Sequence, residues 1–196
     1  MSRYKELEAR LEHTEQQLLL LQKISRYMAR ETNLAEALAG VVTLVVEFME
    51  CDSCLLYLLD SRELILVASN NPQPQTLGRV RLTLDEGLTG WVARERRLLS
   101  ISRESYLDPR FKLFTDLPED SYEAFLSAPI LVRGQVAGVM NVQHRNPHFH
   151  SGGEMELLTT VGEQVGSLVA MALLGREQWD TAKVVDLVMA APARRG

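Results

Sequence analysis

The stretch SAPILVRGQVAGVMNVQHR, residues 127–145, contains two apolar segments separated by a polar break at Arg133 and Gly134. A two-residue break that contains Gly, between apolar segments, is typical of a β-hairpin. Together with the residues just before it, the stretch predicts two long strands over 124–132 and 135–144. Strands that follow one another through hairpins favour an antiparallel sheet over a parallel one.

Shorter apolar segments on the N-terminal side supply further strands. Residues 53–59 and 63–69 read as a strand pair around the polar break Asp60-Ser61-Arg62. The alternating segment 79–84 and the short segment 98–102 add two more strands. Because hairpins dominate this order, the sequence predicts the α+β class with an antiparallel sheet.

Helices are expected at both ends of the chain and once in the middle. Asn33 and Glu36 are a capping pair before an apolar helix, and Ser151 and Glu154 form a capping box before the last long helix. A short helix is expected over 87–97. The terminal helices could cover one face of the sheet, and the short helix with the loop at 103–123 could cover the other. Residues 179–190 could extend the last helix.

The first thirty residues read as one helix with a coiled-coil seam. Apolar positions recur at alternating spacings of three and four, interrupted by two polar residues. Leu19, Leu20 and Ile24 form a second apolar edge, so the helix is expected to pack on more than one neighbour. Self-association is favoured over a helix that lies only on its own domain. The seam positions are Tyr4, Leu7, Leu11, Thr14, Leu18, Leu21, Ser25 and Met28.

Composition points to a protein of the cytoplasm. The 196 residues are 46% hydrophobic and 24% charged, with a formal net charge of −5. An acidic balance argues against binding to nucleic acid or to an anionic membrane surface. No apolar stretch reaches the roughly 18 residues of a membrane span, and the charged N-terminus has no signal-peptide character.

Three motifs in this order resemble a GAF domain: the strand CLLYLLD, the segment LDEGLTGWVARERR, and SAPILVRGQVAGVMNVQHR before a helix at SGGEMELL. The resemblance covers roughly 31–174. It is similar to bacterial signalling GAF domains, such as those of nitrogen phosphotransferase enzyme I and of GAF–ANTAR regulators. It implies a PAS-related, six-stranded antiparallel sheet with helices on both faces. The chain then divides into a signalling helix (1–30), the GAF domain (31–174) and a helical extension (175–196).

The resemblance also implies a ligand pocket between the sheet and the covering helix and loop. Position and residue type select seven candidate lining residues: Leu82, Trp91, Val92, Tyr106, Phe111, Phe114 and Phe125. The alternative is that these side chains fill the space themselves and no ligand binds. The N-terminus of the helix at Gly87 is a further candidate, for an anion, although Gly87 and Gly90 are equally explained by a tight turn.

No cofactor can be assigned from the sequence. The cyclic-nucleotide signature of the family is present only in fragments: Phe111-Lys112, Phe114 and Glu119-Asp120. A pocket cysteine for bilin attachment is missing, and a histidine ligand for haem would have to come from His144 or the turn after it.

Cys51 and Cys54, the only cysteines, stand at the start of a strand. A redox C-x-x-C motif normally lies at a helix N-terminus, so these thiols read as small apolar residues. A zinc site from Cys51, Cys54, His144 and His148 is disfavoured, because a C-x-x-C at a strand start rarely points both sulfurs to one side. His148 and His150 read as turn residues, and no metal site is predicted.

The functional prediction is a non-catalytic sensory or regulatory GAF module. It would act as a homodimer through its N- and C-terminal helices and respond to a small ligand or to a signalling protein in trans. Two alternatives remain: an enzyme of the free methionine sulfoxide reductase type, and a structural dimerisation module with a filled pocket. The enzyme needs cysteines at the pocket, and residues 80–125 contain none.

Overall fold

A computed structural model describes residues 2–30, 33–70, 76–112, 122–172 and 182–190. A six-stranded antiparallel sheet forms the centre, in the order β3-β2-β1-β6-β5-β4. The antiparallel α+β prediction is therefore confirmed. The strands are β1 (Ser53–Asp60), β2 (Glu63–Ser69), β3 (Arg81–Thr83), β4 (Leu99–Ile101), β5 (Ala124–Val132) and β6 (Gln135–His144).

The β5–β6 hairpin forms as the opening stretch predicts, with the predicted bounds. Arg133 and Gly134 have φ of 50° and 75°. Positive φ at both central residues is the geometry of a type I′ turn, whose twist matches the strands that it joins. The turn sets the register, in which Ser127 pairs with Asn141 and Ala128 with Met140.

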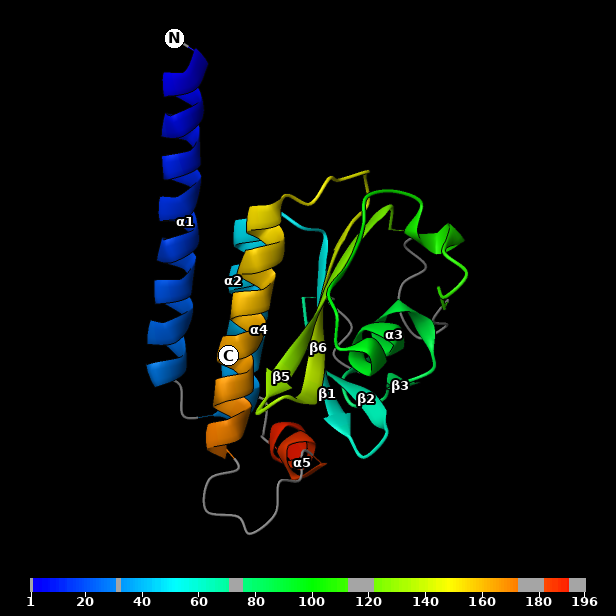
Figure 1. Ribbon diagram of the computed structural model, residues 1–196. Coiled ribbons are helices and arrows are strands. Elements are labelled where there is room, and N and C mark those ends of the chain that lie inside the picture. Colours follow the sequence, from blue (N-terminus) through cyan, green and yellow to red (C-terminus); the bar gives the residue numbers. More distant parts are fainter. Residues whose placement is uncertain (1, 31–32, 71–75, 113–121, 173–181, 191–196) are drawn as a thin grey trace.

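Helices cover both faces of the sheet, and they do so unequally (Figure 1). One face carries α2 (Leu34–Met49) and α4 (Gly152–Ala172), flanked by the long helix α1 (Ser2–Arg30) and, at one end, α5 (Ala182–Ala190). The short helix α3 (Gly87–Glu95) and the 3-10 turn η2 (Ser105–Leu107) lie on the other side. Within the described ranges, no helix is long and apolar enough to cross a membrane.

The predicted caps set the starts of α2 and α4. The Asn33 side chain accepts hydrogen bonds from the amides of Ala35 and Glu36. At α4, the Glu154 amide donates to Ser151 Oγ at 3.2 Å, and the Ser151 amide donates to Glu154 Oε2 at 2.7 Å. This reciprocal pair is the capping box that the sequence predicts.

Two separate apolar cores lie on the two faces. The larger core contains Cys54, Leu56 and Leu58 of β1 together with the buried faces of α2 and α4. The smaller core, under α3, contains Leu55 and Tyr57 from the alternate positions of β1. Strand β1 is therefore buried on both sides, as the alternation of its side chains requires.

The end of the chain differs from the simplest expectation of one longer last helix. Helix α5 is a separate helix that contributes Val184, Val185 and Val188 to the larger core, with contacts to β1, β2 and α2. It covers the part of the sheet that α2 and α4 leave open. Trp179 lies outside the described residues.

Helix α4 approaches β5 closely at two glycines. A Cβ placed on Gly166 would lie 2.8 Å from the Leu131 carbonyl oxygen, and one on Gly162 would lie 3.4 Å from that of Pro129. The first distance is shorter than a carbon–oxygen contact allows. The absence of a side chain at Gly166 therefore sets how near α4 lies to the sheet.

Gly166→Ala should lower the free energy of unfolding by roughly 1–3 kcal/mol, because the added methyl group pushes α4 away from β5. This loss would outweigh the gain of up to about 1 kcal/mol that Ala brings in a helix interior. Gly152→Ala is the matched control, since nothing lies within 4 Å of its Cβ position. Urea unfolding of both variants measures the difference, and equal stabilities would refute the close-packing argument.

Candidate functional site

The candidate site is the face of the sheet that α3 covers, together with residues 105–112. Helix α3 lies close to the end of β3 because Gly90 has no side chain. A Cβ there would meet the Thr83 carbonyl oxygen at 2.6 Å. The two glycines of the GLTG motif thus have a structural role: Gly90 permits this contact, and Gly87 has a φ of 69°.

A salt bridge connects residues 108–112, here called the covering segment, to the start of α3. Lys112 Nζ lies 2.6 Å from Glu86 Oε1, and the Thr83 amide donates to Glu86 Oε2 at 2.8 Å. The hydrogen bond from Lys112, with that from Thr83, lowers the pKa of Glu86 to about 2. Glu86 is therefore ionised at neutral pH, and with Asp85 it places negative charge at the helix N-terminus. This charge weakens the case for an anion at that position.

Arg110 makes the second connection between the covering segment and α3. Its guanidinium carbon lies 4.6 Å from the centre of the Trp91 ring, a cation–π contact. The same guanidinium donates to both carboxylate oxygens of Asp108, at 2.8 and 2.7 Å. Asp108 has a lowered pKa for this reason. Trp91 is thus covered by Arg110.

A chain of polar side chains is buried under α3, where sequence reasoning placed only apolar residues. Ser127 Oγ donates to Asn141 Oδ1 at 2.7 Å, and Asn141 Nδ2 donates to Thr89 Oγ1 at 2.8 Å. All three residues are buried. The network joins β5, β6 and α3, and its hydrogen bonds make it a rigid part of this face. The signal available in the sequence was Asn141 opposite Ser127 across the predicted hairpin.

The seven predicted lining residues do not line one open pocket. Leu82 and Val92 are completely buried in the smaller core, where neighbouring side chains fill the space. Phe125 is buried on β5, and by alternation it shares the face of Ser127. Trp91 and Phe111 are half-buried. Tyr106 is exposed and donates a hydrogen bond to Glu123 Oε1 at 3.1 Å. Phe114 lies outside the described residues.

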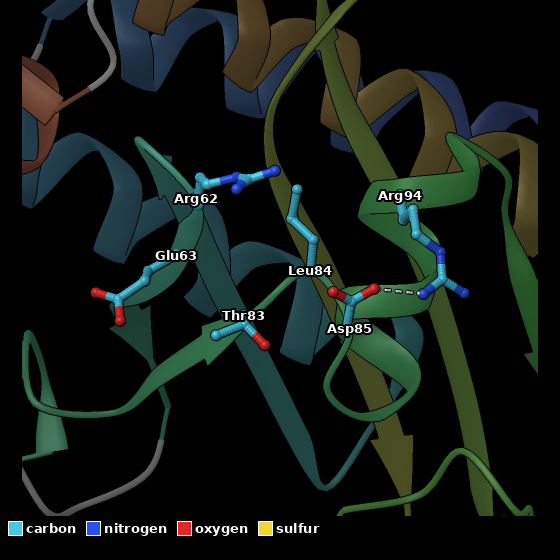
Figure 2. Close-up of a pocket in the computed structure, with 6 residues that line it drawn as sticks. All are labelled: Arg62, Glu63, Thr83, Leu84, Asp85 and Arg94. Atoms are coloured by element: carbon cyan, nitrogen blue, oxygen red, sulfur yellow. Dashed lines mark hydrogen bonds and ion pairs between the residues drawn. The ribbon is translucent and has the colours of Figure 1, made fainter.

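A hollow of about 550 Å³ lies beside β3 and α3 (Figure 2). Five of its six lining residues are polar or charged, and two of them, Arg94 and Asp85, form an ion pair of 2.8 Å. None of the seven predicted residues belongs to its lining. The lining consists of Arg62, Glu63, Thr83, Leu84, Asp85 and Arg94.

The two thiols lie away from the α3 face. Cys51 and Cys54 are buried in the larger core, on the side of α2 and α4. Burial raises the pKa of Cys51 to about 12 and that of Cys54 well above its ordinary value. Both therefore remain protonated at neutral pH, which agrees with their interpretation as small apolar residues.

The six-stranded antiparallel sheet with helices on both faces is the GAF architecture, and comparison with known proteins agrees. Residues 33–169 match the GAF domain family. The chain belongs to this family. A phosphoenolpyruvate-dependent phosphotransferase system protein of Escherichia coli is 30% identical over 159 residues, which are 80% of this chain and 21% of that protein. The Salmonella typhimurium protein is 29% identical over 157 residues. The chain spans about a fifth of the length of these curated relatives.

Solved structures give the same assignment. The GAF domain of an Acinetobacter phosphoenolpyruvate-protein phosphotransferase has a TM-score of 0.75 and 30% identity, covering 83% of this chain and 98% of that one. The corresponding Coxiella burnetii domain has a TM-score of 0.76 and 27% identity, covering 81% and 95%. A free methionine-R-sulfoxide reductase from Neisseria meningitidis shares the fold, with a TM-score of 0.64 and 18% identity over 76% of this chain and 85% of that one.

Asn141→Ala should lower the free energy of unfolding by roughly 1–3 kcal/mol, because it leaves the Ser127 and Thr89 hydroxyls without this buried partner. Gln143→Ala is the control on the same strand and the same face. The Oε1 atom of Gln143 has no hydrogen-bond partner among the described residues, so its removal should cost less. Chemical denaturation compares the two variants, and equal losses would show that the network contributes nothing specific.

Proposed function

We propose that this chain is a cytoplasmic, non-catalytic regulatory GAF module of a phosphotransferase-type signalling protein, and that it acts as a homodimer. The similarity to GAF domains of phosphotransferase proteins, over about four-fifths of the chain, supports the regulatory assignment. The observation that carries the dimer is the exposed apolar seam of α1.

The exposed part of the seam lies in the N-terminal part of α1, which extends beyond the rest of the domain (Figure 1). The exposed fractions are 75% for Tyr4, 59% for Leu7, 60% for Leu11 and 56% for Leu18. Spacings of three, four and seven place these side chains along one stripe of the helix. A row of large apolar side chains in water is unfavourable, and a second copy of the same stripe would bury it.

The C-terminal part of the same helix is anchored to its own domain, and this part includes two seam positions, Leu21 and Met28. Leu20 and Ile24 are buried in the larger core, and Leu21 and Met28 pack against it. Tyr27 donates a hydrogen bond to the Glu36 carbonyl at 3.1 Å, which ties α1 to the first turn of α2. One rigid helix thus bears both the core contact and the proposed dimer contact. A change in the packing of α2 or α4 would move the dimer seam.

The proposed input is a small ligand or a protein partner on the α3 face. Ligand binding that displaces the covering residues 108–112 would alter the contacts of β5 and β6, and the larger core transmits this change to α4 and α1. Such a response is a shift between two packing states. Helix α5 packs into its own domain, so the dimer contact is assigned to α1 rather than to this C-terminal helix.

The packed core under α3 specifically favours a second candidate, a structural dimerisation module. Leu82, Val92 and Tyr57 already occupy that space. The reductase alternative has weaker support, because both thiols lie on the opposite face from α3 and stay protonated.

Leu18→Lys should raise the dimer dissociation constant at least about tenfold, since a charged side chain would enter the apolar seam. Leu19→Lys is the matched control, because this neighbouring leucine is also exposed but lies off the seam. Analytical ultracentrifugation across a concentration series measures both variants. A wild-type chain that is monomeric throughout the series, or equal effects of the two substitutions, would overturn the dimer proposal.

Native mass spectrometry of the protein from its own host, with a thermal-shift screen of nucleotides, oxo-acids and amino acids, separates sensor from structural module. A sensor should show a co-purifying mass, or a melting temperature that rises with ligand concentration as binding linkage requires. A bare dimer with no shift would favour the structural module and contradict small-molecule sensing.

A further inference from the structure

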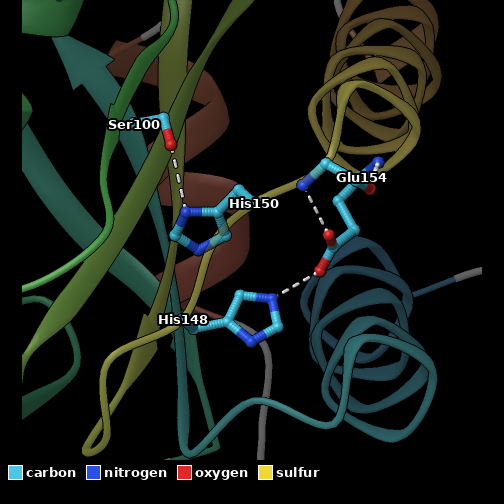
Figure 3. A network of polar contacts seen from close by, with 5 residues as sticks. Ser100, His148, His150 and Glu154 are labelled. Carbon is cyan, nitrogen blue, oxygen red and sulfur yellow. Dashed lines mark hydrogen bonds and ion pairs between the residues drawn. The ribbon is translucent and has the colours of Figure 1, made fainter.

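Three histidines meet where β6 leads into α4, on the face of the sheet that α2 and α4 cover. His144 ends β6, His148 lies in the connection, and His150 directly precedes the capping residue Ser151. One ring nitrogen from each histidine lies within 4.8 Å of the other two. The His144 and His148 rings are stacked with centroids 4.1 Å apart, and those of His148 and His150 are 5.0 Å apart. Figure 3 shows His148 and His150 side by side.

The cluster contains buried ring nitrogens without hydrogen-bond partners. His150 is 2% exposed, and its Nδ1 lies 3.1 Å from Ser100 Oγ. The Nε2 of His150 and both nitrogens of His144, which is 6% exposed, have no partner among the described residues. The Met49 carbonyl lies near enough to raise the pKa of His144, but it does not form a hydrogen bond with either ring nitrogen. Unsatisfied buried nitrogens are rare in native proteins and call for an explanation such as an ion.

A carboxylate orients the remaining histidine. His148 Nε2 lies 2.7 Å from Glu154 Oε1, and the other oxygen of Glu154 is held by the Ser151 amide (Figure 3). This contact leaves Nδ1 of His148 available. An imidazole that binds a carboxylate through one nitrogen and offers the other is the usual arrangement of a metal-ligating histidine. Ser100 plays the same part for His150.

The surrounding charges suit a cation. Burial lowers the pKa of His144 and lowers that of His150 to about 4, which favours the neutral form of each ring. A neutral imidazole has the lone pair that a metal ion needs. The carboxylates of Asp52 and Glu154 both act electrostatically on His144. Among the residues that the structure describes, no lysine or arginine contributes to the pKa shift of either buried ring.

The backbone that carries the cluster is fixed on several sides. The His148 amide donates to the Ser102 carbonyl at 2.9 Å, and the Glu123 amide donates to the His144 carbonyl at 2.9 Å. The Arg145 amide donates to Asp52 Oδ2 at 2.7 Å. The three imidazoles are thus presented by a connection that is hydrogen-bonded to the residue after β4, to the residue before β5 and to the segment before β1.

We propose that His144, His148 and His150 bind one divalent transition-metal ion of the zinc type, each through one ring nitrogen. Three imidazoles are a typical donor set for zinc and leave a fourth position for water. Imidazole donors select zinc, copper or nickel over magnesium or calcium. Bonds of about 2.1 Å at a tetrahedral ion place the nitrogens about 3.4 Å apart. Since the nitrogens now lie within 4.8 Å of one another, each pair must approach by at most about 1.4 Å, which is within the reach of side-chain rotation.

This site differs from the cysteine–histidine set that is disfavoured on the sequence alone. Cys51 and Cys54 are not members of the group, and His150, which was read as a turn residue, is. The bound ion would join the β6 end of the sheet to the first turn of α4. It would act structurally on α4, and this role does not depend on the proposed regulatory function.

The test is zinc titration of the full chain, tag-free and stripped of metal, by isothermal calorimetry, with cobalt absorption as a spectroscopic probe. We expect one zinc per chain, visible absorption bands of four-coordinate cobalt, and a melting temperature that zinc raises and a chelator restores. Absence of saturable binding, or binding without a defined stoichiometry, would overturn the proposal.

Variants locate the site. His148→Gln and His150→Gln should each weaken zinc binding at least tenfold, whereas His13→Gln, which removes the remaining histidine of the chain, should not. Glu154→Gln keeps a capping acceptor and should weaken binding about tenfold through the orientation of His148. If circular dichroism shows that His150→Gln does not fold, the zinc affinity of His148→Gln decides, because His148 is only half-buried. Unchanged affinity in His148→Gln, or an equal loss in His13→Gln, would refute the assignment.

Discussion

The two-sided burial of strand β1 is the constraint on which the rest of the structure depends. Its side chains from Cys54 to Leu58 are buried on both faces, and it pairs with β2 on one side and β6 on the other. A strand of this kind needs an apolar layer above and below it. Helices α2, α4 and α5 supply one layer and α3 the other. The covered α3 face, where a ligand is proposed to act, therefore exists because β1 is apolar on both sides.

The two faces of the sheet carry different chemistry. On the α3 face, Asn141 links a strand hydroxyl to Thr89 on the helix. Lys112 and Arg110 hold the covering segment against α3 through Glu86 and Trp91. On the other face the buried polar groups are concentrated at one end, in the histidine cluster. The thiols lie in the apolar interior of that second face. Redox chemistry at the α3 face would thus lack the cysteines that it needs among the described residues.

Local signals predicted the elements well, because the decisive contacts are close in sequence. The Arg133-Gly134 turn, the Asn33 cap and the Ser151–Glu154 box each involve residues at most three apart, so the β5–β6 hairpin and the starts of α2 and α4 follow from sequence. The site was predicted less well. Whether Trp91 lines a pocket depends on Arg110, nineteen positions away, and the orientation of Tyr106 depends on Glu123. Residue type and spacing along the sequence do not reveal these contacts.

The histidine cluster shows the same limit more sharply. His148 and His150 look like turn residues in sequence, and nothing in their spacing reveals that Ser100, fifty positions earlier, holds one ring. Only the pairing of β4 with β5, and of β5 with β6, brings that serine to the turn.

Helix α4 is the element on which these features converge. Its first turn holds Glu154 beside the histidines, its middle lies against β5 at Gly162 and Gly166, and its outer side contacts α1. Anything that fixes the first turn also restricts how the helix can slide over β5, since the glycine contacts leave little space there. An ion at the histidines would therefore reduce the freedom of α4. In the proposed regulatory role, the metal would set how strongly an event on the α3 face can move the α1 seam, and the metal-free chain would be the more responsive form.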